Sequence, residues 1–258
     1  MTSRARSNAW PQLMPEPVCA WGTPSAPRRH ALLRICPEGF AAALAAFAQA
    51  ERRAGAPGEI PPIVAEWASR GRPLIARRRG AGDPAGAVPA GLPLPPAFGK
   101  LRLALALAPS SIRRIEPPPS LADCVDFAPE DWREPIAAIL QLSGRLGVEA
   151  RTFGSLAWSQ LTGLTYLGLA SDLDLLFILQ PETDVEALLH GLEQIDSDSA
   201  TRLDGEFLRL GSGQAVNWRE LAGGAAEVLV KADDGLALRR RETFLCRDDA
   251  ASLRRRVS

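Results

Sequence analysis

The spacing of apolar residues predicts alternating strands and helices along most of the chain. Short apolar runs indicate strands at 29–35, 72–79, 100–107, 148–153, 171–179, 201–210, 214–221, 227–231 and 236–240. Alanine-rich or helically spaced stretches indicate helices at 37–55, 61–71, 130–147, 154–161 and 181–195. Thr183, with Glu186 three positions later, predicts a capping box for the last helix. This order favours an α/β (α+β) fold, in which a mixed sheet carries flanking helices.

One stretch interrupts this pattern and predicts a domain boundary. Residues 80–99, GAGDPAGAVPAGLPLPPAFG, are too rich in proline and glycine for a continuous helix or strand. We therefore expect an N-terminal α/β lobe at 1–80, with the first 27 or so residues irregular, a linker at 81–99, and a larger domain at 100–258.

Composition narrows the class of protein. The chain has 258 residues, 46% of them apolar, which is enough for a sizeable core. Its longest apolar stretch is about half of the ~18 residues needed to span a membrane, and the N-terminus lacks the apolar region of a secretory signal. The four cysteines lie far apart, which favours reduced thiols over a zinc site or disulfides: Cys19, Cys36, Cys124 and Cys246. These features predict a cytoplasmic protein with no membrane partner.

The net charge of zero hides an asymmetry between the two halves. Residues 1–122 carry 16 basic and 7 acidic side chains, whereas residues 123–258 carry 14 and 23. The halves either attract each other as two lobes, or form a basic lobe for a polyanion beside an acidic site for a cation. A nucleic-acid partner is not expected, because the charge is balanced and the chain has one tyrosine.

Paired acidic residues supply the candidate chemistry. Asp172 and Asp174 stand two positions apart at the start of a predicted strand, so their Cα atoms are about 6.6 Å apart on one face. Two such charges repel by roughly 2.5 kcal/mol at an effective dielectric near 20, which calls for a cation. Mg²⁺, which prefers oxygen ligands, is the expected partner. Asp204 and Glu206 form a second such pair, from which a third carboxylate can come.

Gly154 and Ser155, at the start of a predicted helix, are a candidate anion-binding site to accompany these carboxylates. Glycine permits a tight turn and a close approach to a ligand, and a helix start favours an anion such as phosphate. Such a pair alone is more often an ordinary helix cap, but its combination with the two acidic pairs favours a functional site. Further cationic candidates for phosphate, each of which can instead be a solvated surface charge, are Lys231, Arg77, Arg78 and Arg79. We expect the remaining notable side chains to be structural: Trp158, Trp218, His30 and His190.

The arrangement resembles a known superfamily. Gly-Ser, a helix and Asp-x-Asp on a strand, here Gly154, Ser155, Asp172 and Asp174, resemble the nucleotidyltransferases that include DNA polymerase beta. Within them, GSLAWSQLTGLTYLGLASDLDLL is similar to the malonate decarboxylase holo-acyl-carrier-protein synthases, the phosphoribosyl-dephospho-CoA transferases. RLDGEF, QAVNWREL, VLVK, GRPLIARR and VPAGLPLP add to the likeness, which covers about residues 28–240.

The resemblance implies a reaction and a set of roles. A serine of the carrier subunit would attack the triphosphate of 2′-(5″-triphosphoribosyl)-3′-dephospho-CoA and release pyrophosphate. Asp172 and Asp174 would hold metal, Asp204 or Glu206 would be the third catalytic carboxylate, and Ser155 would bind the pyrophosphate end. Two alternatives are a nucleotidyltransferase that moves AMP from ATP, and a non-catalytic module. The latter is disfavoured, because Gly-Ser and both aspartates are all present.

Overall fold

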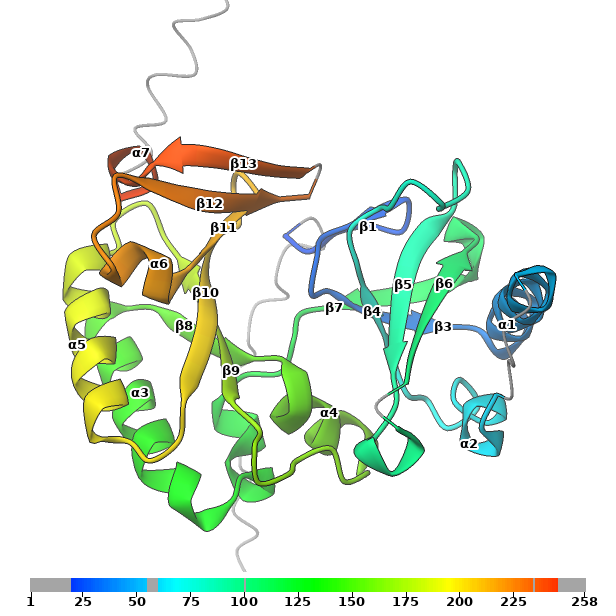
Figure 1. Ribbon diagram of the computed structural model, residues 1–258, viewed down its shortest axis with the longest axis horizontal. Helices are drawn as coiled ribbons and strands as arrows, with labels where there is room; N and C mark the ends of the chain where they lie inside the picture. The colour runs from blue at the N-terminus through cyan, green and yellow to red at the C-terminus, as the bar shows by residue number, and fades with distance from the viewer. Residues whose placement is uncertain (1–19, 55–59, 100, 234, 246–258) are drawn as a thin grey trace, which may run out of the picture.

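The chain folds into two lobes, each built on its own sheet. The computed structural model describes residues 20–54, 60–99, 101–233 and 235–245. The N-terminal lobe holds a five-stranded sheet and the C-terminal lobe a six-stranded one, and α4 lies between them (Figure 1). This mixture of helices and sheets confirms the expected α/β class.

The N-terminal sheet is antiparallel, with strand order β6-β5-β4-β3-β7. Its elements in chain order are β1 (Gly22–Thr23), β2 (Ala26–Pro27), β3 (Leu32–Ile35), α1 (Pro37–Arg53), α2 (Pro62–Ala65), β4 (Leu74–Ala76), β5 (Val88–Pro93), η1 (Pro96–Phe98), β6 (Arg102–Leu107), η2 (Pro109–Ser111) and β7 (Ile112–Glu116).

The prediction of a linker at 81–99 was wrong, because this segment contains β5. β5 pairs with β6 along its whole length but with β4 only at Ala90 and Gly91, so only these two residues have a paired strand on both sides. Pro89 and Pro93 lie outside this doubly paired stretch, and their missing N–H groups therefore cost little. β6, at 102–107, therefore belongs to the N-terminal lobe as well. The passage between the lobes is the short proline run 117–119.

The C-terminal sheet is mixed, with strand order β13-β12-β11-β10-β9-β8. β9 and β10 are parallel and joined through α5, while the other neighbouring strands are antiparallel. Its elements are η3 (Ala122–Phe127), η4 (Glu130–Trp132), α3 (Arg133–Leu146), β8 (Glu149–Thr152), α4 (Gly154–Thr162), β9 (Leu173–Leu179), α5 (Val185–Asp198), β10 (Leu203–Arg209), β11 (Gln214–Asn217), α6 (Trp218–Ala222), β12 (Glu227–Ala232), β13 (Gly235–Arg240) and α7 (Arg241–Leu245).

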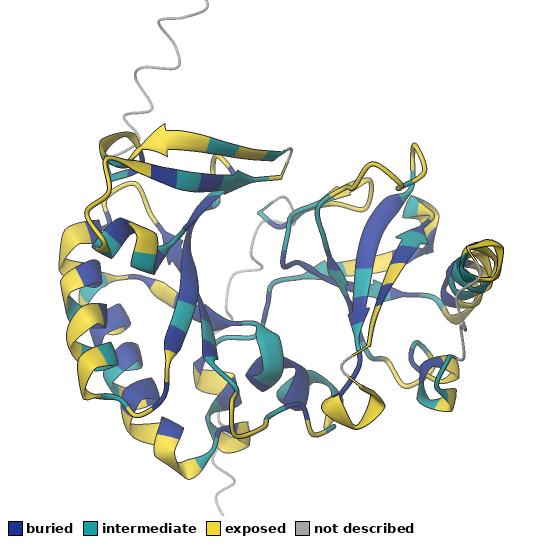
Figure 2. Cartoon of the chain, viewed as in Figure 1, coloured by how far each residue is buried: buried dark blue, intermediate teal, exposed yellow. Residues whose placement is uncertain are grey.

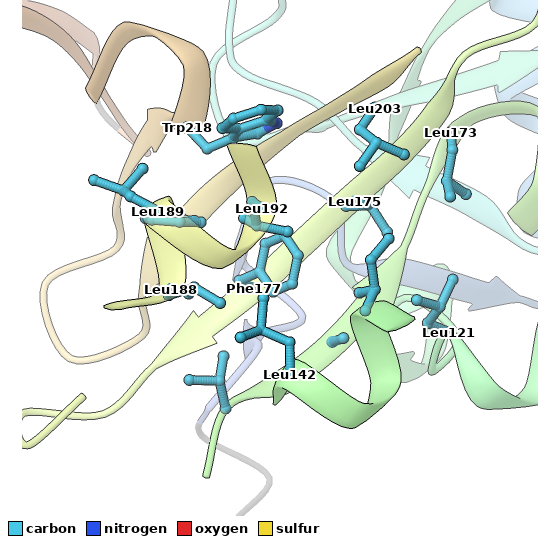
Figure 3. Close-up of a cluster of buried hydrophobic side chains, with 14 of the residues drawn as sticks. Leu121, Leu142, Leu173, Leu175, Phe177, Leu188, Leu189, Leu192, Leu203 and Trp218 are labelled. Atoms are coloured by element: carbon cyan, nitrogen blue, oxygen red, sulfur yellow. The ribbon is translucent and has the colours of Figure 1, made fainter. Parts of the chain in front are cut away.

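The two faces of the C-terminal sheet bury different partners. One face packs against α3 and α5, and its core includes Leu175, Phe177 and Leu203 (Figure 3). The other face turns towards the N-terminal lobe and shares one apolar cluster with it through Trp158, Tyr166, Leu176, Ile178, Leu208 and Ala215. The outer sides of α3 and α5 are exposed (Figure 2). Residues at even positions of β9 and β10 therefore face the junction of the lobes.

Local details differ from the expectation at two helices. α2 ends at Ala65, well short of residue 71, and the chain turns at Gly71 with φ 67°. The cap of α5 is Asp184, which accepts a hydrogen bond from the Ala187 N–H at 3.0 Å, whereas Thr183 accepts one from the Gln180 N–H. The predicted capping box was therefore wrong by one position.

Two general expectations can be compared with the described residues. Within that part of the chain, no helix is both long and apolar enough to cross a membrane. Cys36 and Cys124 are free thiols, and burial raises the pKa of Cys124 to about 12. Cys19 and Cys246 lie outside the described residues.

Candidate active site

The three predicted catalytic carboxylates lie side by side at the start of two parallel strands. Asp174 on β9 is the register partner of Asp204 on β10, and Asp172 comes directly before β9. All three are half-buried. Because β9 and β10 are parallel neighbours, their N-terminal ends lie together at one end of the sheet. The three side chains lie on the face that meets the N-terminal lobe.

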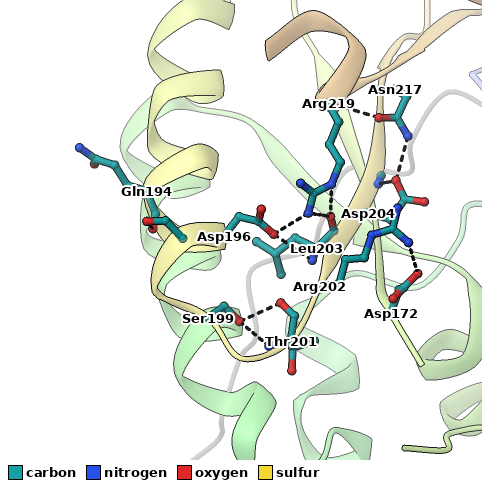
Figure 4. A network of polar contacts seen from close by, with 12 residues as sticks. Asp172, Gln194, Asp196, Ser199, Thr201, Arg202, Leu203, Asp204, Asn217 and Arg219 are labelled. Atoms are coloured by element: carbon teal, nitrogen blue, oxygen red, sulfur yellow. Dashed lines mark hydrogen bonds and ion pairs between the residues drawn. The ribbon is translucent and has the colours of Figure 1, made fainter. Parts of the chain in front are cut away.

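Asp172 and Asp204 each have a neutralising or orienting neighbour (Figure 4). Asp172 Oδ2 accepts a hydrogen bond from the exposed Arg202 at 2.9 Å. Asp204 Oδ1 accepts bonds from Asn217 Nδ2 and from the Gly205 N–H, both at 2.8 Å. These bonds leave Oδ2 of Asp204 without a partner among the described residues.

Asp174 is the carboxylate of this group that is most costly to ionise. Its carboxylate has no hydrogen bond or ion pair within the described residues. Burial, followed by the negative charges of Asp204 and Asp172, raises the pKa of Asp174 to about 7, against the weaker opposing influence of Arg102 and Arg202. A carboxylate that is costly to ionise in the free protein favours a bound cation.

The Asp174 carboxylate leaves no room for a side chain at position 154, which is a glycine. The φ of Gly154 is +64°, and a Cβ atom placed there would lie 1.7 Å from Asp174 Oδ2. The turn is held to β9 by two bonds to the Asp174 carbonyl, from the Phe153 N–H at 3.2 Å and from Thr152 Oγ1 at 2.7 Å. The backbone therefore passes directly over the carboxylate.

Ser155 lies half-buried in the first turn of α4, directly after the glycine that approaches Asp174. The residue before the helix, Phe153, gives no side-chain cap, so the first N–H groups of α4 keep their capacity to bind an anion. An anion-binding helix start thus adjoins carboxylates that favour a cation. This juxtaposition suits a ligand made of phosphate and metal.

The donor set fits a divalent cation, although its side chains are not gathered around one point. Among the described residues, no three His, Cys, Asp or Glu side chains stand close enough together to enclose a metal. Asp172 is turned to Arg202 and Asp204 to Asn217, as mutual repulsion among uncompensated carboxylates predicts. Carboxylate oxygens are nonetheless the ligands that Mg²⁺ prefers, and Mg²⁺ needs few of them.

Glu206, the other candidate for a third carboxylate, is occupied elsewhere. It is buried and bonded to Arg29, to His30 at 3.2 Å and to Lys231 at 2.8 Å. Burial alone would raise the pKa of Glu206, but hydrogen bonds from His30 and Arg29 outweigh it and hold that pKa below its usual range. Lys231, predicted to bind substrate, is therefore paired with Glu206.

Two of the three predicted arginines, Arg77 and Arg79, hold a loop of the N-terminal lobe. Arg77 forms two bonds to Asp83, which lower the pKa of that carboxyl, and also donates to the Ala90 carbonyl. Arg79 donates to carbonyls of the same loop, while Arg78 makes no side-chain bond within the described residues. A substrate role for Arg77 and Arg78 stays a prediction.

Sequence reasoning missed Arg102. It opens β6 and is the register partner of Pro93, whose carbonyl accepts a 2.9 Å bond from the Tyr166 hydroxyl of the C-terminal lobe. It belongs to the N-terminal lobe, and its charge lowers the pKa of Asp174 in the C-terminal lobe. No local pattern distinguished Arg102, because its role depends on how the lobes meet. Asn217 was missed because its bond to Asp204 depends on how β11 pairs with β10 within the C-terminal sheet.

The residues expected to be structural are so placed. Trp158 and Trp218 are buried in the two cores. His190 is exposed on α5 and contacts Gln194. His30 is buried, as part of the group around Glu206.

Two cavities lie away from the carboxylates. One of about 360 Å³ opens between α1 and α2 and is lined by apolar side chains such as Phe40 and Leu44. The other, of about 420 Å³, lies at the passage between the lobes and is lined by Arg114 and Arg151 among others. Neither cavity is lined by Asp172, Asp174 or Asp204. We therefore place the chemistry at the N-terminal ends of β9 and β10.

Carboxylates grouped beside a glycine turn and a helix start are typical of enzymes that transfer phosphate-containing groups. Comparison with known proteins identifies the family. Residues 28–118 match the model of the phosphoribosyl-dephospho-CoA transferase MdcG N-terminal domain, and residues 120–242 that of its C-terminal domain. The boundary between them coincides with the passage between the two lobes.

Curated relatives agree with the family models. A phosphoribosyl-dephospho-CoA transferase of Xanthomonas campestris pv. campestris (strain 8004) is 41% identical over 191 residues, which cover 74% of this chain and 89% of the relative. One of Bradyrhizobium diazoefficiens is 38% identical over 219 residues, or 85% and 92% of the two chains. No solved structure matches. The chain belongs to the phosphoribosyl-dephospho-CoA transferase family and is a transferase.

Proposed function

We propose that the chain transfers phosphoribosyl-dephospho-CoA from 2′-(5″-triphosphoribosyl)-3′-dephospho-CoA to a serine of the acyl carrier protein subunit of malonate decarboxylase. Family membership supports the donor, and the MdcG family name supports the acceptor. The observation that carries the proposal is the contact of Gly154 with Asp174, which brings an anion-binding helix start onto a carboxylate group.

In this proposal the acceptor serine oxygen forms a bond to the α-phosphorus of the donor, while the bond from that phosphorus to pyrophosphate breaks. The N–H groups at the start of α4, with the Ser155 hydroxyl, bind the pyrophosphate end. Arg102 neutralises phosphate charge from the other lobe. The serine proton passes to Oδ2 of Asp204, the oxygen that Asn217 and Gly205 leave open. These groups act by position and charge, as phosphoryl transfer requires.

Mg²⁺ is the cofactor we propose. Asp172 and Asp174 would hold it, with Asp204 as the third carboxylate, and when bound it would supply charge stabilisation to the oxygens of the reacting phosphate. Loss of repulsion among the carboxylates would then add to its affinity. The proposed setting is the cytoplasm, where the carrier subunit would be available.

The test is the intact mass of purified apo carrier subunit after incubation with the protein, Mg²⁺ and the donor. ATP alone replaces the donor in a parallel tube, and the Asp172→Ala/Asp174→Ala variant is the control. We expect a gain equal to phosphoribosyl-dephospho-CoA, absent with the variant. A gain of AMP from ATP would instead support a different nucleotidyl transfer. No gain, with a carrier that another enzyme can load, would refute the proposal.

A further inference from the structure

Glu206 collects charged partners from both lobes in one buried cluster. Arg29 and His30 belong to the segment that enters β3, in the N-terminal lobe, while Glu206 and Lys231 lie on β10 and β12 of the C-terminal sheet. The Glu206 side chain is 6% exposed and those of Arg29, His30 and Lys231 are 19, 10 and 24% exposed. We call these four residues the Glu206 cluster.

The backbone at His30 indicates that the cluster constrains the chain. His30 has φ 70°, a conformation that side chains rarely adopt. Its ring lies against Phe153, with 4.5 Å between the ring centroids, and its Nε2 contacts Glu206. Such a conformation persists where the surroundings hold it from several sides. The residue next to the Gly154 turn thus touches the same histidine that Glu206 binds.

The Glu206 cluster is one of several contacts between the lobes, and it lies on β10, apart from the others. The passage 117–119 is tied to β8, where the Thr152 N–H donates to the Pro119 carbonyl at 3.1 Å. Tyr166, after α4, donates to Pro93. The shared apolar cluster is non-directional and permits sliding. The Glu206 cluster adds a buried, directional contact on β10, which restricts rotation of one lobe against the other.

We propose that Glu206 is a positioning residue: through Arg29 and His30 it fixes the N-terminal lobe, and with it Arg102, over the carboxylates of the site. The proposal rests on the proposed function in one respect, namely that the positioned groups bind the phosphates of the donor. Glu206 itself touches neither donor nor metal. Its place two residues after Asp204 on the same strand face explains how a lobe contact can set the geometry of the site.

The first part of the test does not depend on activity. Backbone amide hydrogen exchange is compared for wild type, Glu206→Gln and Arg29→Gln, where Arg29→Gln removes one of the two bonds to the N-terminal lobe but leaves Glu206 with His30 and Lys231. We expect faster exchange in both variants at the amides of 28–33 and 102–105, with unchanged protection in β9. The control is Asp233→Asn, which breaks the more exposed Arg28–Asp233 ion pair at the same junction and keeps an oxygen that can accept the bond from the Arg29 N–H.

The second part measures transfer to the carrier serine. We expect KM for the donor to rise about tenfold in Glu206→Gln with kcat changed less than about threefold, a smaller KM rise in Arg29→Gln, and partial recovery in Arg29→Lys. Asp233→Asn should stay within about twofold of wild type.

Four results decide between the alternatives. Unchanged exchange in Glu206→Gln and Arg29→Gln would overturn the lobe contact whatever the kinetics. Faster exchange with unchanged KM and kcat would overturn the positioning role. A hundredfold fall in kcat at constant KM for Glu206→Gln alone would overturn it too, because Glu206 would then act in the chemistry. Absence of transfer by wild type would refute the proposed function, and the exchange data alone would then decide whether the cluster holds the lobes.

Discussion

Asp174 and Glu206 are two acidic residues on neighbouring strands and on the same face of one sheet, yet their surroundings are opposite. The Asp174 carboxylate has no hydrogen bond within the described residues, and burial together with two negative neighbours raises its pKa to about 7. Glu206 is more deeply buried, but its cationic and hydrogen-bonding partners hold its pKa below the usual range. The comparison teaches that the partners of a buried carboxylate decide its role. An unsatisfied carboxylate is prepared for a ligand, whereas a satisfied one holds the structure together.

Replacement of Asp174 should have the largest effect on activity. We expect Asp174→Asn to lower transfer to the carrier by at least about a thousandfold, because the proposed cation loses its central ligand. The measurement is the initial rate of mass gain of the carrier at saturating Mg²⁺. Glu206→Gln, which alters a carboxylate on the same face, is the matched variant and should keep kcat within about threefold. Equal losses of kcat in both variants would remove the distinction between the two carboxylates.

The pKa of Asp174 predicts how stability depends on pH in the absence of divalent cations. The folded-state pKa is raised above the unfolded value, so the contribution of the protonated form is complete below about pH 4 and is lost as pH rises through about 7. A shift from 3.8 to about 7 corresponds to a loss on the order of 4 kcal/mol.

Unfolding by urea with a chelator, at pH 5 and pH 8, measures the larger part of this loss, because the rest has already occurred at pH 5. Mg²⁺ should restore more stability at pH 8 than at pH 5, because it competes with protons for the same oxygens. In Asp174→Asn both dependences should be much weaker. If the wild-type protein and this variant show the same change between pH 5 and pH 8, another group is responsible.

Gly154 provides a sharper test, because a matched glycine lies nine residues further on. A Cβ on Gly154 would collide with the Asp174 carboxylate, whereas Gly163, with a similar φ of +67°, has nothing within 4 Å of that position. Alanine at either position should destabilise the fold by about 1–2 kcal/mol through the positive φ.

Transfer should separate the two variants. We expect Gly154→Ala to lose about a hundredfold in kcat/KM, and Gly163→Ala to stay within about threefold of wild type. The measurement is the transfer rate at a temperature where both variants are folded. Similar activities would mean that the approach of the turn to Asp174 is unimportant for the reaction.

Arg102 should give the smallest of these effects. We expect Arg102→Gln to raise KM for the donor about tenfold with a lesser change in kcat, because one phosphate contact from the N-terminal lobe is lost. Arg113→Gln, which removes an exposed arginine from β7 of the same sheet, is the charge-matched control. A donor KM that is equal in the two variants would assign the effect of Arg102 to net charge alone.

The sequence was informative where chemistry depends on neighbours along the chain. Gly154, Ser155, Asp172 and Asp174 could be found because a turn, a helix start and a strand start impose short, fixed spacings. The pairing of Asp204 with Asp174 was within reach, since both open predicted strands. These local patterns also predicted most of the helices and strands.

Other features could not be predicted because they depend on contacts between distant segments. Glu206 shares its spacing pattern with Asp204, and only its partners Arg29 and His30, more than 170 residues away in the chain, reveal that it is satisfied. Arg102 becomes notable once the lobes meet. The strand β5 was hidden by prolines that lie outside its doubly paired stretch. In each case tertiary contacts outweigh the local signal.

The central claim is that Asp174 and its neighbours, and not Glu206, form the cation site. The most direct measurement is calorimetric titration of Mg²⁺ into the wild-type protein, Asp174→Asn and Glu206→Gln at pH 8, without substrate. We predict binding to the wild-type protein and to Glu206→Gln with similar affinity, and its loss in Asp174→Asn. Undiminished binding to Asp174→Asn, or loss of binding in Glu206→Gln alone, would contradict this account.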